Sequence, residues 1–165
     1  MDLNYYKKNS KNKRKENNLF FKLLKKIPPK VLDKIIHPIH DNVFKKTNCL
    51  ECANCCKTTS PIFSDKDIIR IAKHLNLRPS EFTEKYLKID DEQDYVLNSL
   101  PCSFLAKDNY CSIYNVRPRA CKEFPHTSRK KQYQLLNLTK KNLEVCPASY
   151  NIIEEVKNSL DKNLR

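Results

Sequence analysis

The sequence predicts a small, mainly α-helical fold with a short β-hairpin and irregular cysteine-bearing loops, and three observations support this prediction. Apolar residues recur at helical spacing in several segments. The apolar fraction is only 39% while 31% of the 165 residues are charged, so one thin core is expected. Eight cysteines follow residue 48, and we expect them to help hold that core together.

Residues 1–48 form a basic N-terminal arm in this interpretation. Residues 1–16 are rich in Lys and Asn without any period, which predicts disorder. A short amphipathic helix is expected over residues 17–27, where apolar side chains recur at helical spacing until Pro28 and Pro29 stop it. A second apolar segment over residues 31–39 is expected to pack on the cysteine domain.

Residues 49–165 are predicted to form a cysteine-cluster domain with helices at both ends. Ser64 and Asp67 have the spacing of a capping box, which predicts a helix of about three turns after Ser64. Pro79 near a first helical position predicts the next helix, and a further helix is expected after Pro147.

Between these helices the sequence changes to an extended pattern. The acidic turn "DDEQD" is followed by "YVLNSLPCSFL", and "AKDNY" then turns the chain into "CSIY". This order predicts a hairpin that presents Cys102 and Cys111. "NVRPRACKEF" predicts a short helix opened by Asn115, with Pro118 in its first turn.

The formal charge of +13 is uneven along the chain. Residues 1–48 hold 13 Lys and Arg against 4 Asp and Glu, or +9, and residues 49–165 hold 19 against 15, or +4. The arm is therefore the segment expected to contact nucleic acid or an acidic membrane surface, although docking of its apolar side on its own domain is favoured. The chain contains no Gly, which excludes glycine-rich phosphate loops and dinucleotide fingerprints.

The N-terminal segment does not resemble an export signal, because Lys22, Lys25 and Lys26 interrupt its only apolar stretch. No transmembrane segment is expected either, since no run approaches about 20 apolar residues. We therefore expect a reducing cytoplasm, where clustered cysteines bind metal or act in redox chemistry more often than they form disulfides.

The cysteine pattern itself favours a soft metal. Cys49, Cys52 and Cys55 are spaced C-x2-C-x2-C, a spacing that lets one tight loop direct three thiolates at one point. Cys56 is adjacent to Cys55, and neighbouring side chains usually diverge, so the pair is expected to serve two metals, or one cluster and a bridge. A redox dithiol protein and simple reduced buried cysteines stay open as alternatives.

The motifs "CxxCxxCC", "PCSFL", "CSIYNVRPRACKEFP" and a later "CP" resemble the CxxCxxCC family of zinc- or iron-chelating proteins, also called YkgJ-like cysteine-cluster proteins, over residues 48–150. The resemblance implies a metal-stabilised domain with about two metal centres, in which Tyr114, Arg117 and Pro118 are framework positions. The implied metal ligands are Cys49, Cys52, Cys55, Cys56, Cys102, Cys111, Cys121 and Cys146. The cysteine module of a flagellin lysine methylase is similar to this family.

The sequence does not choose between zinc and iron. Four-sulfur sites suit zinc and iron–sulfur clusters equally. The C-x2-C-x2-C spacing, together with a cysteine before a proline at Cys146, is typical of ferredoxin ligation and favours a 4Fe–4S cluster, whereas dispersed ligands fit a structural two-zinc core. The predicted function is a metal-binding cysteine-cluster protein with an unknown protein partner or substrate. The alternative is an iron–sulfur-dependent enzyme or electron-transfer protein related to the methylase modules, so enzymatic activity stays open.

Other candidate sites are weaker. His37 and His40 form H-x2-H but are expected to be ordinary polar residues, as is His126. The acidic run is expected to be a solvated turn rather than a cation site. Arg117 and Arg119 are candidates for phosphate binding, but an arginine there more often holds loop carbonyls. The acidic residues in question are Asp90, Asp91, Glu92 and Asp94.

Overall fold

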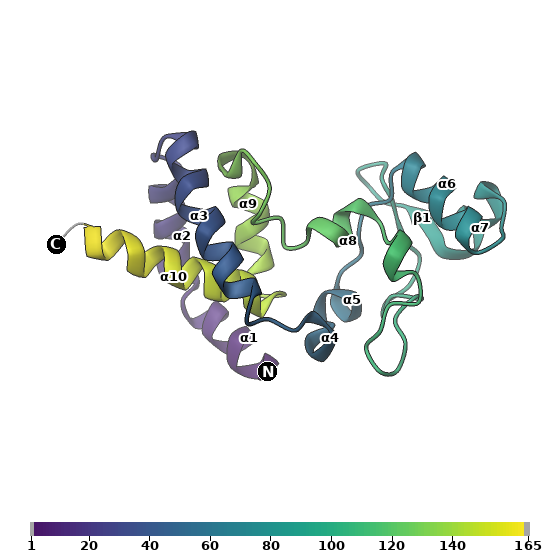
Figure 1. Cartoon of the computed structure of the whole chain (residues 1–165), viewed down its shortest axis with the longest axis horizontal. Helices are drawn as coiled ribbons and strands as arrows, with labels where there is room; N and C mark the ends of the chain where they lie inside the picture. Colours follow the sequence, from purple (N-terminus) through teal and green to yellow (C-terminus); the bar gives the residue numbers. More distant parts are fainter. Residues whose placement is uncertain (1, 164–165) are drawn as a thin grey trace. The chain divides into compact units, whose positions relative to one another are not determined.

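The computed structural model describes residues 2–163 and confirms the predicted mainly helical fold with one small antiparallel sheet (Figure 1). Its contacts divide the chain into two compact units. The helical unit comprises residues 1–48 and 125–165, and the cysteine unit comprises residues 49–124. The predicted division of the sequence at residue 48, into a basic arm and a cysteine-cluster domain, stays a prediction. In the structure, the contacts place unit boundaries after residues 48 and 124.

Both segments of the helical unit, residues 1–48 and 125–165, contribute helices to it. These helices are α1 (Leu3–Asn12), α2 (Arg14–Leu24), α3 (Pro29–Phe44), α9 (Gln132–Asn142) and α10 (Pro147–Asn163). Helix α10 packs on α3 and α1, and α9 packs on α2 and α3. The chain beyond residue 124 therefore completes the core of the N-terminal segment.

The expectation that residues 1–16 are disordered is wrong. Helix α1 begins after Asp2, whose carboxylate Oδ1 accepts hydrogen bonds from the backbone N–H groups of Asn4 and Tyr5 at 2.9 and 3.1 Å. The Tyr6 ring meets the Tyr150 ring edge-on, with centroids 5.7 Å apart. Local capping and a long-range contact to α10 thus order a segment whose composition alone predicts disorder.

The core of the helical unit is aliphatic. Its buried members are Phe21, Leu24, Leu32, Ile36, Val43, Leu136, Leu143, Ala148, Ile152, Ile153 and Val156. The predicted helices after residues 17 and 147 are confirmed, but the apolar face of α2 is rotated from the expected one, because Leu23 is 53% exposed and Phe21 is buried. Helix α9 was not predicted, since polar residues interrupt its short apolar stripe.

The cysteine unit is built from shorter elements. They are α4 (Cys49–Cys52), α5 (Asn54–Thr58), α6 (Asp65–His74), α7 (Pro79–Tyr86), β1 (Leu87–Ile89), β2 (Tyr95–Leu97), the 3-10 helix η1 (Tyr114–Val116) and α8 (Arg119–Glu123). Its buried core is Phe63, Ile68, Ile71, Ala72, Phe82, Leu87, Leu97, Phe104 and Ile113. Two of the cysteines, Cys102 and Cys111, pack against this core.

The predicted helices after Ser64 and near Pro79 are confirmed, and the sheet is displaced. The helix expected to open at Asn115 is wrong, because Arg117 and Pro118 are extended, with ψ of 151° and 150°, and separate η1 from α8. Ser64 and Asp67 form the capping box of α6, and Pro79 occupies the first turn of α7. The antiparallel ladder pairs Leu87 with Leu97 and lies on either side of the acidic turn. The hairpin expected around Cys102 and Cys111 is reduced to a single bridge between Leu105 and Cys111.

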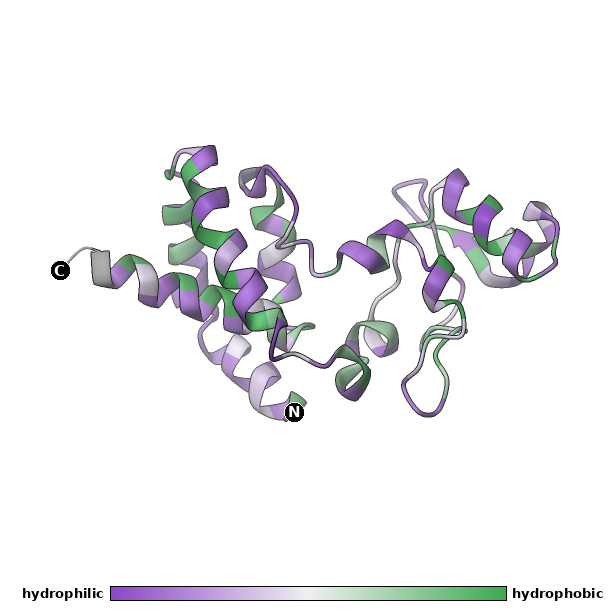
Figure 2. Cartoon of the chain, viewed as in Figure 1, coloured by the Kyte–Doolittle hydropathy of each residue, from purple (hydrophilic) through white to green (hydrophobic). Residues whose placement is uncertain are grey.

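Hydrophobic residues line the inner faces of the helices, and hydrophilic residues cover their outer faces (Figure 2). None of the helices within residues 2–163 has both the length and the hydropathy needed to cross a bilayer.

Candidate metal centre

The segment with the densest cysteines folds as two short helices joined at Ala53. Ala53 is buried and has left-handed backbone angles, with φ of 46° and ψ of 19°. A non-glycine residue in this conformation costs about 1–2 kcal/mol. The turn separates α4, which carries Cys49 and Cys52, from α5, which carries Cys55 and Cys56.

The adjacent thiols of α5 lie close together. The Sγ atoms of Cys55 and Cys56 are 3.9 Å apart. Two thiolates on one tetrahedral zinc, each with a bond of about 2.3 Å, stand about 3.8 Å apart. The expectation from the sequence was divergence of the two side chains, but the distance in the structure suits two ligands of one metal.

Backbone hydrogen bonds bring two further cysteine segments to α5. The Cys102 N–H donates to the carbonyl of Cys56 at 2.8 Å. The segment after Cys102 in turn pairs with the next one, through the bridge between Leu105 and Cys111 and a 2.9 Å bond from the Ser112 N–H to the Phe104 carbonyl. Thiol-bearing segments some 50 residues apart are therefore fixed to one another by the main chain.

The loop that leads to Cys121 is held by an ion pair on α6 whose carboxylate, that of Asp67, is buried. Asp67 Oδ1 accepts from Arg70 Nη2 at 2.6 Å and from the Arg119 N–H at 3.2 Å. Arg70 Nη2 also contacts the carbonyls of Val116 and Arg117, at 3.4 and 3.1 Å. Analysis of the sequence identified Asp67 only as a helix cap, because its second partner lies 52 residues further along the chain.

Burial of the Asp67 carboxyl opposes its ionisation, but this effect is outweighed. Hydrogen bonds from Ser64, Arg70 and the backbone N–H groups of Ser64 and Arg119 hold the pKa of Asp67 below its usual value. Asp67 is therefore charged at neutral pH. The charged Asp67 carboxylate thus holds the Cys121 loop, because it accepts the Arg119 N–H at the start of α8 (Arg119–Glu123).

Desolvation dominates the acidity of the thiols. Burial, together with the negative charges of Cys56, Cys102 and Cys111, raises the pKa of Cys121 to about 12. Burial likewise raises the pKa of Cys102 to about 11. The opposite holds for Cys56, whose pKa is lowered to about 7 by the Cys55 thiol. Cys102 and Cys121 are therefore neutral thiols at pH 7, and a bound metal cation would have to displace their protons to form thiolates.

None of the eight cysteines, all within the described residues, forms a disulfide, and seven of them lie in the cysteine unit. Cys146 lies in the helical unit, where it packs against the aliphatic core and accepts a 3.5 Å hydrogen bond from the Ser149 N–H. Among the side chains of the described residues, no three of Cys, His, Asp or Glu converge closely enough to hold a metal ion together. The soft donor set fits zinc or iron in its chemistry, and the assignment of individual ligands stays a prediction.

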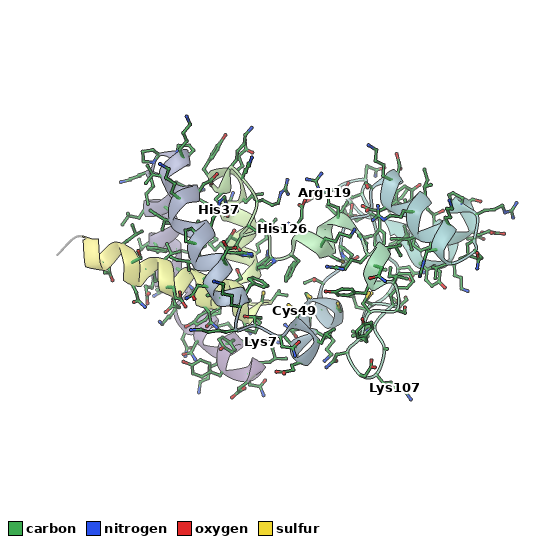
Figure 3. The ribbon with its side chains drawn as sticks, viewed as in Figure 1. Lys7, His37, Cys49, Lys107, Arg119 and His126 are labelled. Carbon is green, nitrogen blue, oxygen red and sulfur yellow. The ribbon has the colours of Figure 1, made fainter. Side chains whose placement is uncertain are left out.

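The histidine candidates lie in the helical unit. On α3, His37 Nε2 lies 2.9 Å from the Arg129 carbonyl, and His40 Nδ1 lies 2.8 Å from Thr127 Oγ1. His126 has left-handed backbone angles at the start of the C-terminal half, with φ of 71°. The three serve hydrogen bonding or chain geometry, and Figure 3 shows His37, His126 and Cys49 with their side chains.

The remaining candidates also have structural partners. Asp90 Oδ1 accepts from the N–H groups of Glu92 and Asp94, each at 3.0 Å, as in a turn. Arg117 Nη1 donates to the Tyr114 carbonyl at 2.7 Å, and its guanidinium lies 3.8 Å from the Tyr114 ring centre. Arg119 pairs with Glu123 on α8 at 2.6 Å (Figure 3). The interpretation of Arg117 as a loop-holding residue is supported.

Comparison with known protein families gives a match over residues 48–147, to the family described as "CxxCxxCC: Putative zinc- or iron-chelating domain". The match covers more than half of the chain and includes every cysteine. Comparisons with curated proteins and with solved structures found no match.

Proposed function

The chain belongs to this family of zinc- or iron-chelating, cysteine-rich domains, and from that premise we propose that its thiolates form about two metal centres that hold the fold. The function is then that of a metal-binding module. The observation that carries the proposal is the 3.9 Å separation of Cys55 Sγ and Cys56 Sγ, beside a backbone bond that joins Cys56 to Cys102.

In this proposal, one four-sulfur centre takes its ligands from among the two thiols of α5 and those of Cys102, Cys111 and Cys121. Their segments are joined by the main chain or anchored to α6, and the charges of Cys56, Cys102 and Cys111 act on the Cys121 thiol. Cys49, Cys52 and Cys146 stay ligands that the family resemblance implies, without an assignment to either centre. When bound, zinc or iron neutralises the thiolates and converts its binding free energy into folding free energy.

The protein's own residues prepare these ligands. Ala53 fixes the turn that places α5, and Asp67 with Arg70 fixes the loop before α8. Positive charge from Arg117 favours the thiolate forms of Cys49 and Cys121 and so lowers their pKa against the larger effect of burial. These contacts order the cysteine segments of a unit whose apolar core is small.

The test is elemental analysis and an absorption spectrum of protein purified without air. We expect about two zinc or iron equivalents per chain, because eight thiolates supply two four-sulfur sites. The Cys102→Ser variant should lose about one equivalent, whereas Ser103→Ala, a change at the exposed neighbouring position, should retain both. Full metal content in Cys102→Ser would contradict the ligand assignment.

The same spectrum decides the alternative function. Colourless protein with zinc indicates closed structural sites. Iron with acid-labile sulfide and a brown colour indicates a cluster, which would favour an iron–sulfur enzyme or electron-transfer protein and is supported so far by the C-x2-C-x2-C spacing.

A further inference from the structure

The excess positive charge of the chain belongs to the helical unit alone. Residues 49–124 contain eleven Lys and Arg and eleven Asp and Glu, so they carry no net formal charge. The whole formal charge of +13 therefore lies on residues 1–48 and 125–165. Apart from Cys146, the thiolates that bind metal would add their negative charge to the cysteine unit. Metal binding would therefore increase the difference in net charge between the two units.

Three carboxylates of the helical unit are already engaged within it. Glu16 and Glu154 accept hydrogen bonds from the buried Lys157 at 2.6 and 2.7 Å, and Glu154 also pairs with Lys13. The two Asp33 oxygens accept the N–H groups of Lys131 and Gln132, each at 2.8 Å. These carboxylates are therefore not available to neutralise cations elsewhere on the unit.

The unopposed cations line a groove between α2 and α9, which pack on each other. Two adjacent hollows, of about 370 and 280 Å³, share the lining residues Asn18 and Lys140 and together make up the groove. We call it the basic groove, and its cationic residues are Arg14, Lys22, Lys25, Lys140 and Lys141. Glu144 lies at one end, and none of the described residues that line the second hollow is acidic.

The groove also offers neutral hydrogen-bonding groups. Asn18 Oδ1 accepts from Lys140 Nζ at 3.1 Å, and Asn137 lines the second hollow from α9. Tyr133 lies one helical turn before Asn137, on the same face of α9, and is 42% exposed. Cations, amides and an exposed aromatic ring in one row are the side chains that track a single-stranded polynucleotide and stack its bases.

We propose that the basic groove binds single-stranded nucleic acid through its phosphates. Arg14 and Lys25 are eleven residues apart on α2, a distance of about 16 Å that suits a short extended strand. A groove between two packed helices is narrow and concave, so it admits one strand more easily than a duplex. The proposal does not depend on the metal centres, because every residue that carries it lies in the helical unit.

An acidic membrane is the competing partner. Leu19 and Leu23 are 67% and 53% exposed on the outer side of α2, and such residues favour insertion into a bilayer. The groove favours nucleic acid, because the apolar side of α2 is already buried through Phe21 and Leu24. Two leucines are a small apolar surface beside five cations and two amides.

The test measures binding of the full-length, metal-containing protein to a fluorescent oligouridine by anisotropy over a series of salt concentrations. The triple variant Lys22→Gln/Lys25→Gln/Lys140→Gln should bind at least tenfold more weakly at about 0.15 M salt. Its slope of log affinity against log salt should fall in magnitude by about 2, since each single-strand phosphate contact contributes about 0.7. Tyr133→Ala should weaken binding about tenfold with an unchanged slope.

The control variant is Lys66→Gln/Lys73→Gln/Lys107→Gln, which removes the same charge from exposed positions of the cysteine unit. It should retain the affinity and slope of the parent chain, and the helical content of all variants should match. Equal weakening by both triple variants would overturn the proposal in favour of unspecific charge. No binding to oligouridine would also overturn it, as would binding only to anionic vesicles that is lost in Leu19→Ala/Leu23→Ala.

Discussion

Replacement of Asp67 by Ala tests whether the α6 anchor orders the Cys121 loop. The side chain is 4% exposed and receives four hydrogen bonds, from Ser64 N, Ser64 Oγ, Arg70 Nη2 and Arg119 N. Its removal breaks the α6 capping box and leaves the Arg119 N–H without its carboxylate. It also removes the partner of the Arg70 guanidinium.

The magnitude follows from these contacts. Loss of a capping residue costs about 1 kcal/mol. The unsatisfied Arg119 N–H costs about 1 kcal/mol more. Loss of the charge-assisted bond to Arg70 also costs about 1 kcal/mol, a value lowered by solvent screening because Arg70 is 37% exposed. The Asp67→Ala variant should therefore lower the free energy of unfolding of the cysteine unit by about 3 kcal/mol.

Hydrogen exchange measured by mass spectrometry resolves this effect within the full-length, metal-containing protein. Amides of residues 65–74 and 114–123 should exchange about 100-fold faster in Asp67→Ala, because about 1.4 kcal/mol corresponds to a tenfold change. Amides of α9 and α10 should be unchanged. Asp65→Ala is the matched control, since Asp65 is exposed in the same helical turn and should change exchange less than threefold.

The reasoning would be refuted by a particular pattern of exchange. If residues 65–74 lost protection while residues 114–123 kept it, Asp67 would be a helix cap only, and the loop before Cys121 would be ordered by something else. Equal effects of Asp67→Ala and Asp65→Ala would show that the buried contacts contribute nothing beyond the charge near the helix start.

Three further predictions follow from the helical unit, the α4–α5 turn and the metal. Hydrogen bonds from Lys13 and Lys157 outweigh the burial of Glu154 and hold its pKa below 4.5. The helical unit should therefore lose stability as the pH falls below about 4.5. Glu154→Gln should flatten this pH dependence of the thermal unfolding temperature. Ala53→Gly should change the free energy of unfolding by less than about 1 kcal/mol, whereas Ala53→Val should cost about 3 kcal/mol and reduce metal content, because a β-branched residue does not tolerate the buried left-handed turn. Chelation should unfold the cysteine unit and leave the helical unit protected from hydrogen exchange; protection of both units would contradict a fold held by metal.

Much of the fold follows from the sequence because its signals are local. The capping box at Ser64, the proline at the start of α7 and the periodic apolar residues of α10 each act within a turn or two of one helix. The sequence did not predict helix α1, because packing on α10, as well as its cap, orders it. The left-handed turn at Ala53 was not predicted either, since in a chain without Gly the residues expected at such turns are Asn and Asp.

The sequence by itself determined the donor chemistry: eight thiols in the order of a metal-chelating family, and an excess of positive charge. Only the tertiary structure decided which segments share a unit, and it joined residues 125–163 to the N-terminal helices, so that the positive charge gathers there. It also gave Asp67 its second partner and set the Cys55 and Cys56 sulfurs 3.9 Å apart. The Asp67 contact depends on how segments 52 residues apart pack, and the sulfur separation depends on the backbone of α5, so the spacing of residues along the chain encodes neither.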